Sequence, residues 1–146
     1  MNHDFNNFLS PFSWRYGSPE MRAIFSEKYK RTQWRKIWYT LALSQYEYGL
    51  ISKSELNDIK KFSSSSSVNI KRSLAIEKKI RHDLMSEIKT FAAQAKKGGG
   101  KIHLGATSMD IEDNADMLII REALLIILEK TVDCLALLSE KIKSYS

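Results

Sequence analysis

The sequence has few of the residues that crosslink or interrupt a chain: one cysteine, two prolines and six glycines in 146 residues. A single cysteine, Cys134, cannot form an intramolecular disulfide. Small disulfide-rich secreted scaffolds are therefore excluded, and a reducing, cytoplasmic setting is the simpler expectation. The prolines and glycines fall between periodic segments rather than inside them, which is typical of helices joined by turns. We therefore predict an all-α fold.

Long hydrophobic runs and site motifs are also absent. The longest strongly apolar stretch, residues 123–128, is far shorter than the roughly 20 residues of a membrane-spanning helix. The N-terminal segment shows neither the basic nor the apolar region of a secretory signal. No H-E-x-x-H, C-x-x-C, Walker-type or G-x-S-x-G pattern occurs, so the sequence predicts no metal site and no bound cofactor. We expect Cys134, inside an apolar segment, to be a buried and inert thiol.

The positive charge is unevenly distributed. The formal net charge is +6, but residues 1–101 carry 19 basic and 9 acidic side chains, whereas residues 102–146 carry 4 and 8. A basic segment suggests an anionic partner, with nucleic acid as the first candidate. The basic residues occur, however, as pairs such as Lys30-Arg31 and Arg35-Lys36, at spacings typical of solvated helix faces. Because no nucleic-acid-binding motif accompanies them, we expect surface charge and no nucleic-acid partner.

Capping patterns predict where the helices begin. Ser18-Pro19-Glu20 has a serine N-cap and a proline at the first helical position. Ser52-Lys53-Ser54-Glu55 is a capping box. The serine run at residues 63–67 is expected to be a flexible loop rather than a site. Apolar periodicity and glycine stops predict helices over residues 27–48, 53–62, 69–79 and 83–97.

The last predicted helix has an unusual composition. Thr107-Ser108-Met109-Asp110 fits a T-x-x-D capping pattern, and the following residues 117–142 are apolar on nearly every face. A helix that is apolar all round requires burial all round, and five shorter helices are too few to wrap it. We therefore expect a small N-terminal helical domain, residues 1–107, followed by the beginning of a long-helix bundle domain, residues 108–146, in a chain that is part of a longer protein.

Three histidines are candidates for chemistry. His3 lies in a terminal segment that is expected to be frayed. His82 stands in Arg81-His82-Asp83 at a predicted helix start, where backbone N–H groups favour an anion; alternatively, Asp83 caps the helix or orients the ring. His103 precedes Gly105 and the hydroxyl pair Thr107-Ser108, which together suit a carboxylate or a phosphate. The plain alternative at this pair is an ordinary N-cap.

Taken together, three segments resemble the N-terminal part of adenylosuccinate lyases, members of the fumarase/aspartase superfamily. In order, they are residues 13–21 (SWRYGSPEM), 81–85 (RHDLM) and 103–114 (HLGATSMDIEDN). The resemblance implies β-elimination of fumarate from adenylosuccinate to give AMP. It also implies the same cleavage of the succinyl-carboxamide ribotide in purine biosynthesis. It implies no cofactor, and a homotetramer whose active sites take residues from three subunits.

The resemblance also implies roles for individual residues. Arg15-Tyr16 match residues that bind the nucleotide phosphate. Arg81-His82-Asp83 match a substrate-binding triplet whose histidine acts as an acid or base or orients the substrate. Thr107-Ser108 match the pair that binds the succinyl group, and His103 lies in the same wall of the substrate site. The family's main acid histidine and serine base have no match here, so we expect the chain alone to be inactive.

Two functions remain open at this point. The first is a contribution to a cytoplasmic, homo-oligomeric lyase that acts on a small nucleotide. The alternative is a non-catalytic helical module that pairs with a full-length lyase through its apolar helix.

Overall fold

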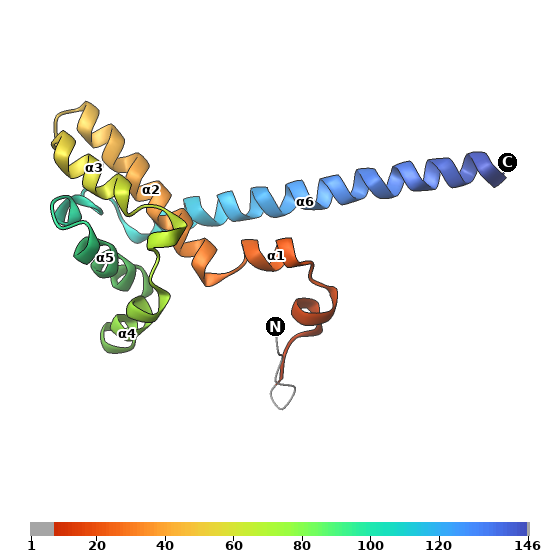
Figure 1. The fold of residues 1–146 in the computed structure, drawn as a ribbon, viewed down its shortest axis with the longest axis horizontal. Helices are drawn as coiled ribbons and strands as arrows, with labels where there is room; N and C mark the ends of the chain where they lie inside the picture. Colours follow the sequence, from red (N-terminus) through yellow and green to blue (C-terminus); the bar gives the residue numbers. More distant parts are fainter. Residues whose placement is uncertain (1–7, 146) are drawn as a thin grey trace.

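The computed structural model describes residues 8–145, which contain helices and turns but no strand. The all-α prediction is confirmed. A short π-helical turn, η1, and a six-residue helix precede the long α2, and four further helices and two 3-10 turns follow (Figure 1). In order, the elements are η1 (Phe12–Tyr16), α1 (Pro19–Ile24), α2 (Glu27–Glu47), α3 (Lys53–Lys61), η2 (Ser65–Ser67), α4 (Ile70–Ile80), α5 (Asp83–Gln94), η3 (Gly99–Lys101) and α6 (Ser108–Tyr145).

The helix starts follow the local capping patterns. The hydroxyls of Ser18 and Ser26 accept hydrogen bonds from backbone N–H groups in the first turns of α1 and α2. Ser52 and Glu55 form the complete capping box that was expected for α3. Since a cap links residues only three positions apart, these starts can be predicted without knowledge of the tertiary structure.

The segment after α5 folds onto α3, so α5 ends at Gln94 rather than at residue 97. The backbone N–H groups of Lys97 and Gly98 donate to the Asp58 carboxylate at 2.7 and 3.2 Å. A Cβ atom on Gly98 would lie 2.6 Å from the backbone oxygen of Glu55. Glycine is required there because two stretches of backbone approach closely.

The core lies between α2, α3, α5 and the first turns of α6. Trp34 and Trp38 of α2 are 2% and 0% exposed, and they belong to one buried cluster with Leu84 and Phe91 of α5 and Ile111 of α6. Each side chain of this size contributes about 1.5–3 kcal/mol when it is fully buried. The beginning of α6 is therefore part of the same core as α2 and α5.

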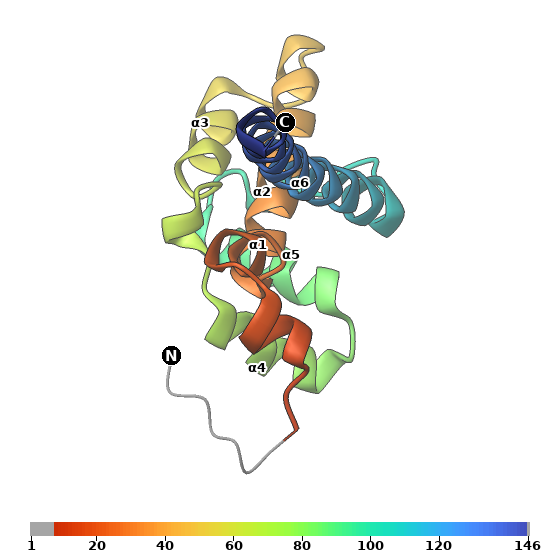
Figure 2. The same cartoon turned by 90° about the vertical axis from the view of Figure 1, so that its right-hand side faces the viewer.

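The rest of α6 projects away from this body (Figures 1 and 2). Ile111, Ala115, Ile119 and Ala123 are buried, but every residue from 127 to 145 is exposed. We call residues 127–145 the outer segment of α6. The expectation that the shorter helices cannot cover the apolar helix is confirmed for the outer segment. In the first half of α6, in contrast, one side of the helix is buried.

The outer segment corrects the expectation for Cys134. Its thiol is free and its side chain is exposed, not buried, because no other described element packs against this part of α6. Despite its length and its many leucines, α6 does not meet the requirements for a membrane-spanning helix, and neither does any other helix within residues 8–145.

Candidate functional site at two helix N-termini

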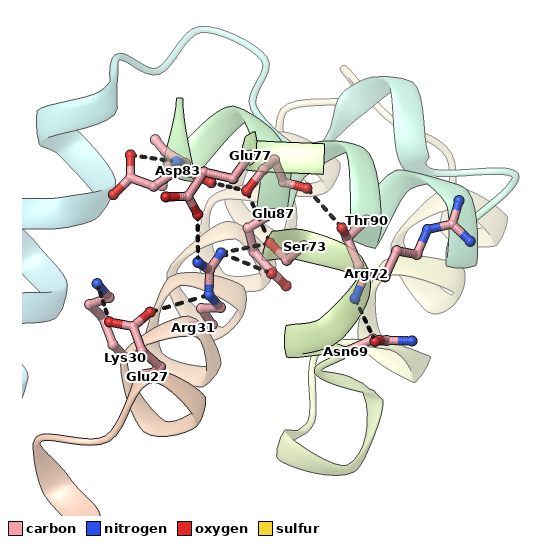
Figure 3. A network of polar contacts seen from close by, with 12 residues as sticks. Glu27, Lys30, Arg31, Asn69, Arg72, Ser73, Glu77, Asp83, Glu87 and Thr90 are labelled. Carbon is pink, nitrogen blue, oxygen red and sulfur yellow. Dashed lines mark hydrogen bonds and ion pairs between the residues drawn. The ribbon is translucent and has the colours of Figure 1, made fainter. Parts of the chain in front are cut away.

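A buried network of charged side chains fastens α4 and α5 to α2 (Figure 3). Arg31 Nη1 donates to Ser73 Oγ at 2.7 Å and lies 3.4 Å from Glu87 Oε2, while Arg35 Nε donates to Glu87 Oε1 at 2.7 Å. Arg31, Arg35 and Glu87 are at most 1% exposed. Burial lowers the pKa of Arg35, and Glu87 opposes that shift. The interpretation of Arg31 and Arg35 as solvated surface residues is therefore wrong, because α4 and α5 cover this face of α2.

The same network holds the serine run. Arg35 Nη1 donates to the backbone oxygen of Phe62 at 2.7 Å and to Gln94 Oε1 at 2.8 Å. Gln94 Nε2 donates in turn to the backbone oxygen of Ser67 at 2.8 Å. The run was expected to be a flexible loop; in the structure it contains the η2 turn, and the network holds it at Ser67 and at Phe62, the residue before it.

The network supports the turn between α4 and α5, which carries Arg81-His82-Asp83. Arg81 ends α4 in the left-handed conformation, with φ 53° and ψ 41°. This conformation costs a residue with a Cβ atom about 1–2 kcal/mol. The Arg81 side chain is exposed, and its guanidinium pairs with no residue in the described part of the chain. Backbone strain of this kind persists where the surroundings enforce it, and it is concentrated at functional sites.

His82 itself caps α5. Its Nδ1 accepts a hydrogen bond from the backbone N–H of Met85 at 3.3 Å. The Asp83 carboxylate lies 3.8 Å from the same nitrogen and accepts from the backbone N–H of Leu84 at 2.7 Å. The cap is thus the imidazole of His82 rather than the carboxylate of Asp83, which lies beside the ring.

The loop that carries His103 is fastened to α2 by two side chains seven residues apart. Trp38 Nε1 donates to His103 Nδ1 at 3.1 Å, and Gln45 Nε2 donates to the backbone oxygen of Leu104 at 2.7 Å. Residues at this spacing lie on one face of a helix, so α2 presents both donors to the loop. Gly105, with φ +74°, then turns the chain toward α6.

The hydroxyls of Thr107 and Ser108, at the start of α6, differ in their contacts. The Thr107 N–H and Oγ1 lie 2.8 and 3.1 Å from Asp110 Oδ2, and these two hydrogen bonds lower the pKa of the Asp110 carboxyl. This is one half of the expected capping box. Ser108 is half-buried, and its hydroxyl has no hydrogen-bond partner among residues 8–145. Ser108 can therefore bind a ligand without giving up a contact.

The N-termini of α5 and α6 lie close together. Burial lowers the pKa of His103, and His82 shifts that pKa in the same direction. Burial, followed by the nearby Asp83, raises the pKa of Glu112. Asp83 and Glu112 line one cavity of about 310 Å³ with residues of α2, and a more open cavity of about 630 Å³ is lined by Arg81, His82 and Asp83 together with α4. The smaller cavity is acidic, because Asp113 and Asp116 of α6 also line it. Anions are therefore better suited to the open cavity, where the Arg81 guanidinium lies beside the N-terminus of α5.

Arg15-Tyr16 do not join this site. Both residues are exposed in η1, where the Arg15 guanidinium lies 4.7 Å from the centre of the Trp14 ring. Figure 1 shows η1 on the arm that precedes α1, apart from the turn between α4 and α5. Within one chain, Arg15-Tyr16 are therefore separate from the other residues that the resemblance assigns to substrate. His3 lies outside the described residues.

Sequence reasoning missed three residues that shape the site: Trp38, Gln45 and Glu112. The helical period explains Trp38 as a core residue but does not say where its N–H group points. A buried indole N–H usually has a hydrogen-bond partner, and this was the available signal. Gln45 and Glu112 carried no signal, because their partners are remote in the sequence.

No protein-family model matches the chain, but its similarity to curated proteins extends over nearly all of it. The chain is 36% identical over 144 residues to the adenylosuccinate lyase of Saccharomyces cerevisiae. It is 39% identical over 139 residues to that of Schistosoma mansoni, and 37% identical over 138 residues to that of Methanocaldococcus jannaschii. These matches cover 94–97% of this chain but only 28–30% of the relatives. An N-acetyl-S-(2-succino)cysteine lyase of Dickeya dadantii is 31% identical over 116 residues, which are 80% of this chain and 26% of that relative.

The fold and the polar site thus belong to a chain that is homologous to lyases. Within that class, the chain is homologous to adenylosuccinate lyases along nearly its whole length, and it spans about 30% of theirs.

Proposed function

We propose that this chain supplies part of the substrate site of an adenylosuccinate lyase. In the proposed reaction, a base removes a proton from the carbon next to a carboxylate of the succinyl group. The bond between the succinyl carbon and the amino nitrogen then breaks, and an acid protonates the departing nitrogen. The products are fumarate and AMP. The same cleavage of the succinyl-carboxamide ribotide would place the protein in purine biosynthesis.

The observation that carries the proposal is the meeting of the α5 and α6 N-termini in a chain with these relatives. Adenylosuccinate has one phosphate and two carboxylates, so its site requires guanidinium groups, hydroxyls and oriented N–H groups. Arg81, Ser108 and the two helix starts offer these groups with few competing contacts. The Dickeya relative is named for a substrate that carries a succino group. This favours recognition of a succinyl group by the region that the two chains share.

Each group of residues has a role in this proposal. His103 and Thr107-Ser108 hold the succinyl group, and Arg81-His82-Asp83 bind the substrate, with His82 as an orienting or acid–base group. Arg15-Tyr16 bind the phosphate. Because η1 lies apart from the rest, this pair would serve the site of another subunit, in keeping with a cytoplasmic homotetramer whose sites are shared. The main acid and base would come from parts of the relatives that the chain does not match.

A chimaeric enzyme tests the proposal directly. The matching 144 residues of the yeast relative are replaced by this chain, and fumarate release from adenylosuccinate is measured. We expect an active chimaera, in contrast to the purified chain alone, which should show negligible turnover. A folded, tetrameric chimaera without activity would contradict the proposal, and robust turnover by the isolated chain would contradict the expected dependence on other segments.

Variants of the chimaera separate the roles. Arg15→Ala should chiefly raise KM, because a phosphate contact is made in the ground state and the transition state alike. Ser108→Ala should lower kcat/KM if the free hydroxyl orients the succinyl group. Ser64→Ala, in the exposed serine run, is the matched control and should change neither constant. Wild-type constants for Ser108→Ala would leave Ser108 as a plain helix-start residue.

The exposed outer segment of α6 supports an alternative function, that of a non-catalytic helical module. A non-catalytic module would bury this segment against a full-length lyase. Purified chain mixed with the yeast enzyme should then co-sediment with it, and Leu135→Lys should abolish the complex. Failure to co-sediment, together with an active chimaera, would exclude this alternative.

A further inference from the structure

The hydrogen bond between Trp38 and His103 joins a fixed donor to a ring that has two neutral tautomers. Trp38 is fully buried, and its ring packs against Phe91 with 6.1 Å between ring centres. Its Nε1 lies 3.1 Å from His103 Nδ1, and the two rings meet at an angle of 89°. The indole N–H group can only donate. His103 Nδ1 is therefore the acceptor and carries no proton.

This geometry decides where the imidazole proton lies. A neutral imidazole carries one proton, so in His103 it is on Nε2. Within residues 8–145, no group forms a hydrogen bond with that nitrogen. A proton on Nδ1 would face the indole N–H group, and neither of these two donors would then have an acceptor. Trp38 therefore disfavours both the imidazolium and the opposite tautomer.

We propose that Trp38 is a positioning residue that holds His103 as the neutral Nε2–H tautomer, which donates a hydrogen bond toward the substrate. The identity of the acceptor rests on the proposed function: a carboxylate oxygen of the succinyl group of adenylosuccinate. A ring in this state does not remove a proton, because Nε2 already carries one and the Nδ1 lone pair is engaged by the indole. His103 thereby binds and stabilises negative charge, and it is not the base.

The groups that face His103 from the neighbouring elements act as follows. Burial has the largest effect and lowers the pKa of His103. Asp110, in the first turn of α6, favours the imidazolium, whereas His82, at the turn between α4 and α5, disfavours it. The Asp110 carboxylate is already engaged by Thr107. The indole contact, the burial and His82 therefore act together against protonation, and Asp110 only partly offsets them.

The test is a long-range ¹H–¹⁵N NMR spectrum of the imidazole nitrogens in the ¹⁵N-labelled 146-residue chain, followed from about pH 8 to about pH 5. The His103 signals are identified by their loss in His103→Gln. In the wild-type chain we expect Nδ1 to have the shift of an unprotonated nitrogen and Nε2 that of a protonated one. Trp38→Phe keeps an aromatic ring but loses the donor. It should mix the tautomers and raise the titration midpoint of His103 by about half to one pH unit.

Trp34→Phe is the matched control. Trp34 lies one turn earlier on α2, is 2% exposed, and its indole nitrogen has no hydrogen-bond partner in the described part of the chain. This variant should leave the tautomer and the midpoint of His103 unchanged. A wild-type proton on Nδ1, or the same behaviour of His103 in both tryptophan variants, would overturn the proposal.

A second measurement covers the case in which Trp38→Phe does not fold. In the wild-type chain, the indole N–H signal of Trp38 should shift with the midpoint of His103, while that of Trp34 should not. A Trp38 indole N–H signal that stays constant while His103 titrates would contradict the proposal. Because no substrate is present, the outcome is independent of whether the protein acts as a lyase.

Discussion

The body around α2 buries charged side chains, whereas the outer segment of α6 exposes apolar ones. In the body, Arg31, Arg35 and Glu87 are almost completely inaccessible to solvent. In the outer segment, apolar side chains such as Leu135 and Leu138 are 61% and 53% exposed. The comparison teaches that burial here depends on which helices pack together, and not on the polarity of each side chain.

The two regions are also stabilised differently. In the body, each buried charge depends on a partner from another helix, so the loss of one partner leaves an uncompensated charge in a water-poor environment. The outer segment depends on its own backbone hydrogen bonds and on good helix formers such as Leu, Ala, Glu and Lys. Single substitutions should therefore have large effects in the body and small ones in the outer segment.

The largest expected effect comes from Glu87→Gln. It leaves Arg31 and Arg35 buried without their shared carboxylate, and it should lower the free energy of unfolding by about 3–5 kcal/mol. Urea unfolding followed by circular dichroism measures this loss. The control is Glu77→Gln, which removes a 33% exposed carboxylate that lies 3.2 Å from Arg31 Nη2. Arg31 keeps Glu87 in this variant, so the loss should be less than about 1 kcal/mol. Equal, small effects at both positions would mean that the buried network contributes little.

The next prediction tests where α6 passes from the buried core to the exposed outer segment. Ile111→Ala should cost about 2–5 kcal/mol, because it opens a cavity in the core at a side chain that is 1% exposed. Leu135→Ala, in the outer segment, should change the free energy of unfolding by no more than about 0.5 kcal/mol. Thermal and urea unfolding of both variants provide the comparison. A comparable loss at Leu135 would show that the outer segment is buried in solution.

The third prediction concerns the contact that ties α6 to α2. Burial raises the pKa of Tyr29 from 10.0 to about 12, with a further contribution from its hydrogen bond to Glu122. The folded state thus holds the phenol proton more tightly than the unfolded chain does. The resulting stability is complete below pH 10 and is lost as the pH rises toward 12.

Because Tyr29 is partly exposed, the expected loss is about 1 kcal/mol. It is measured as the free energy of unfolding at a series of alkaline pH values. Tyr29→Phe removes the titrating group and should flatten this part of the profile. Parallel profiles for the wild type and the variant would assign the alkaline loss to other groups.

The smallest expected effect concerns the strained turn of the candidate site. Arg81→Gly and Arg81→Ala both remove the guanidinium, but only glycine adopts the left-handed conformation without strain. Arg81→Gly should therefore exceed Arg81→Ala in free energy of unfolding by about 0.5–1 kcal/mol. Equal stabilities in urea unfolding would show that the turn relaxes when the arginine side chain is lost.

Much of the fold could be predicted, because its signals are local. Ser18, Ser52 and Asn69 cap their helices through contacts only three residues away, and such patterns are visible in the sequence. The apolar surface of α6 is likewise visible as a run of leucines and isoleucines. The capping patterns predicted where helices begin, and the apolar run predicted the excess of apolar surface that the outer segment displays.

The candidate site was only partly predictable. Arg81-His82-Asp83 and His103 were singled out from the sequence, but nothing in it indicated that Trp38 holds the ring of His103, 65 residues away. Nor did it indicate that Arg35 and Glu87, 52 residues apart, form a buried pair, since scattered basic pairs look like ordinary surface charge.

The sequence by itself determined the helices, their caps and the apolar character of α6, because each of these depends on neighbours within one or two turns. Only the tertiary structure decided which arginines are buried, which histidine nitrogen is engaged and that Arg15-Tyr16 stay apart from the rest of the site. Those outcomes depend on helices that meet across long stretches of chain, where packing and desolvation, rather than local preference, set the environment of each side chain.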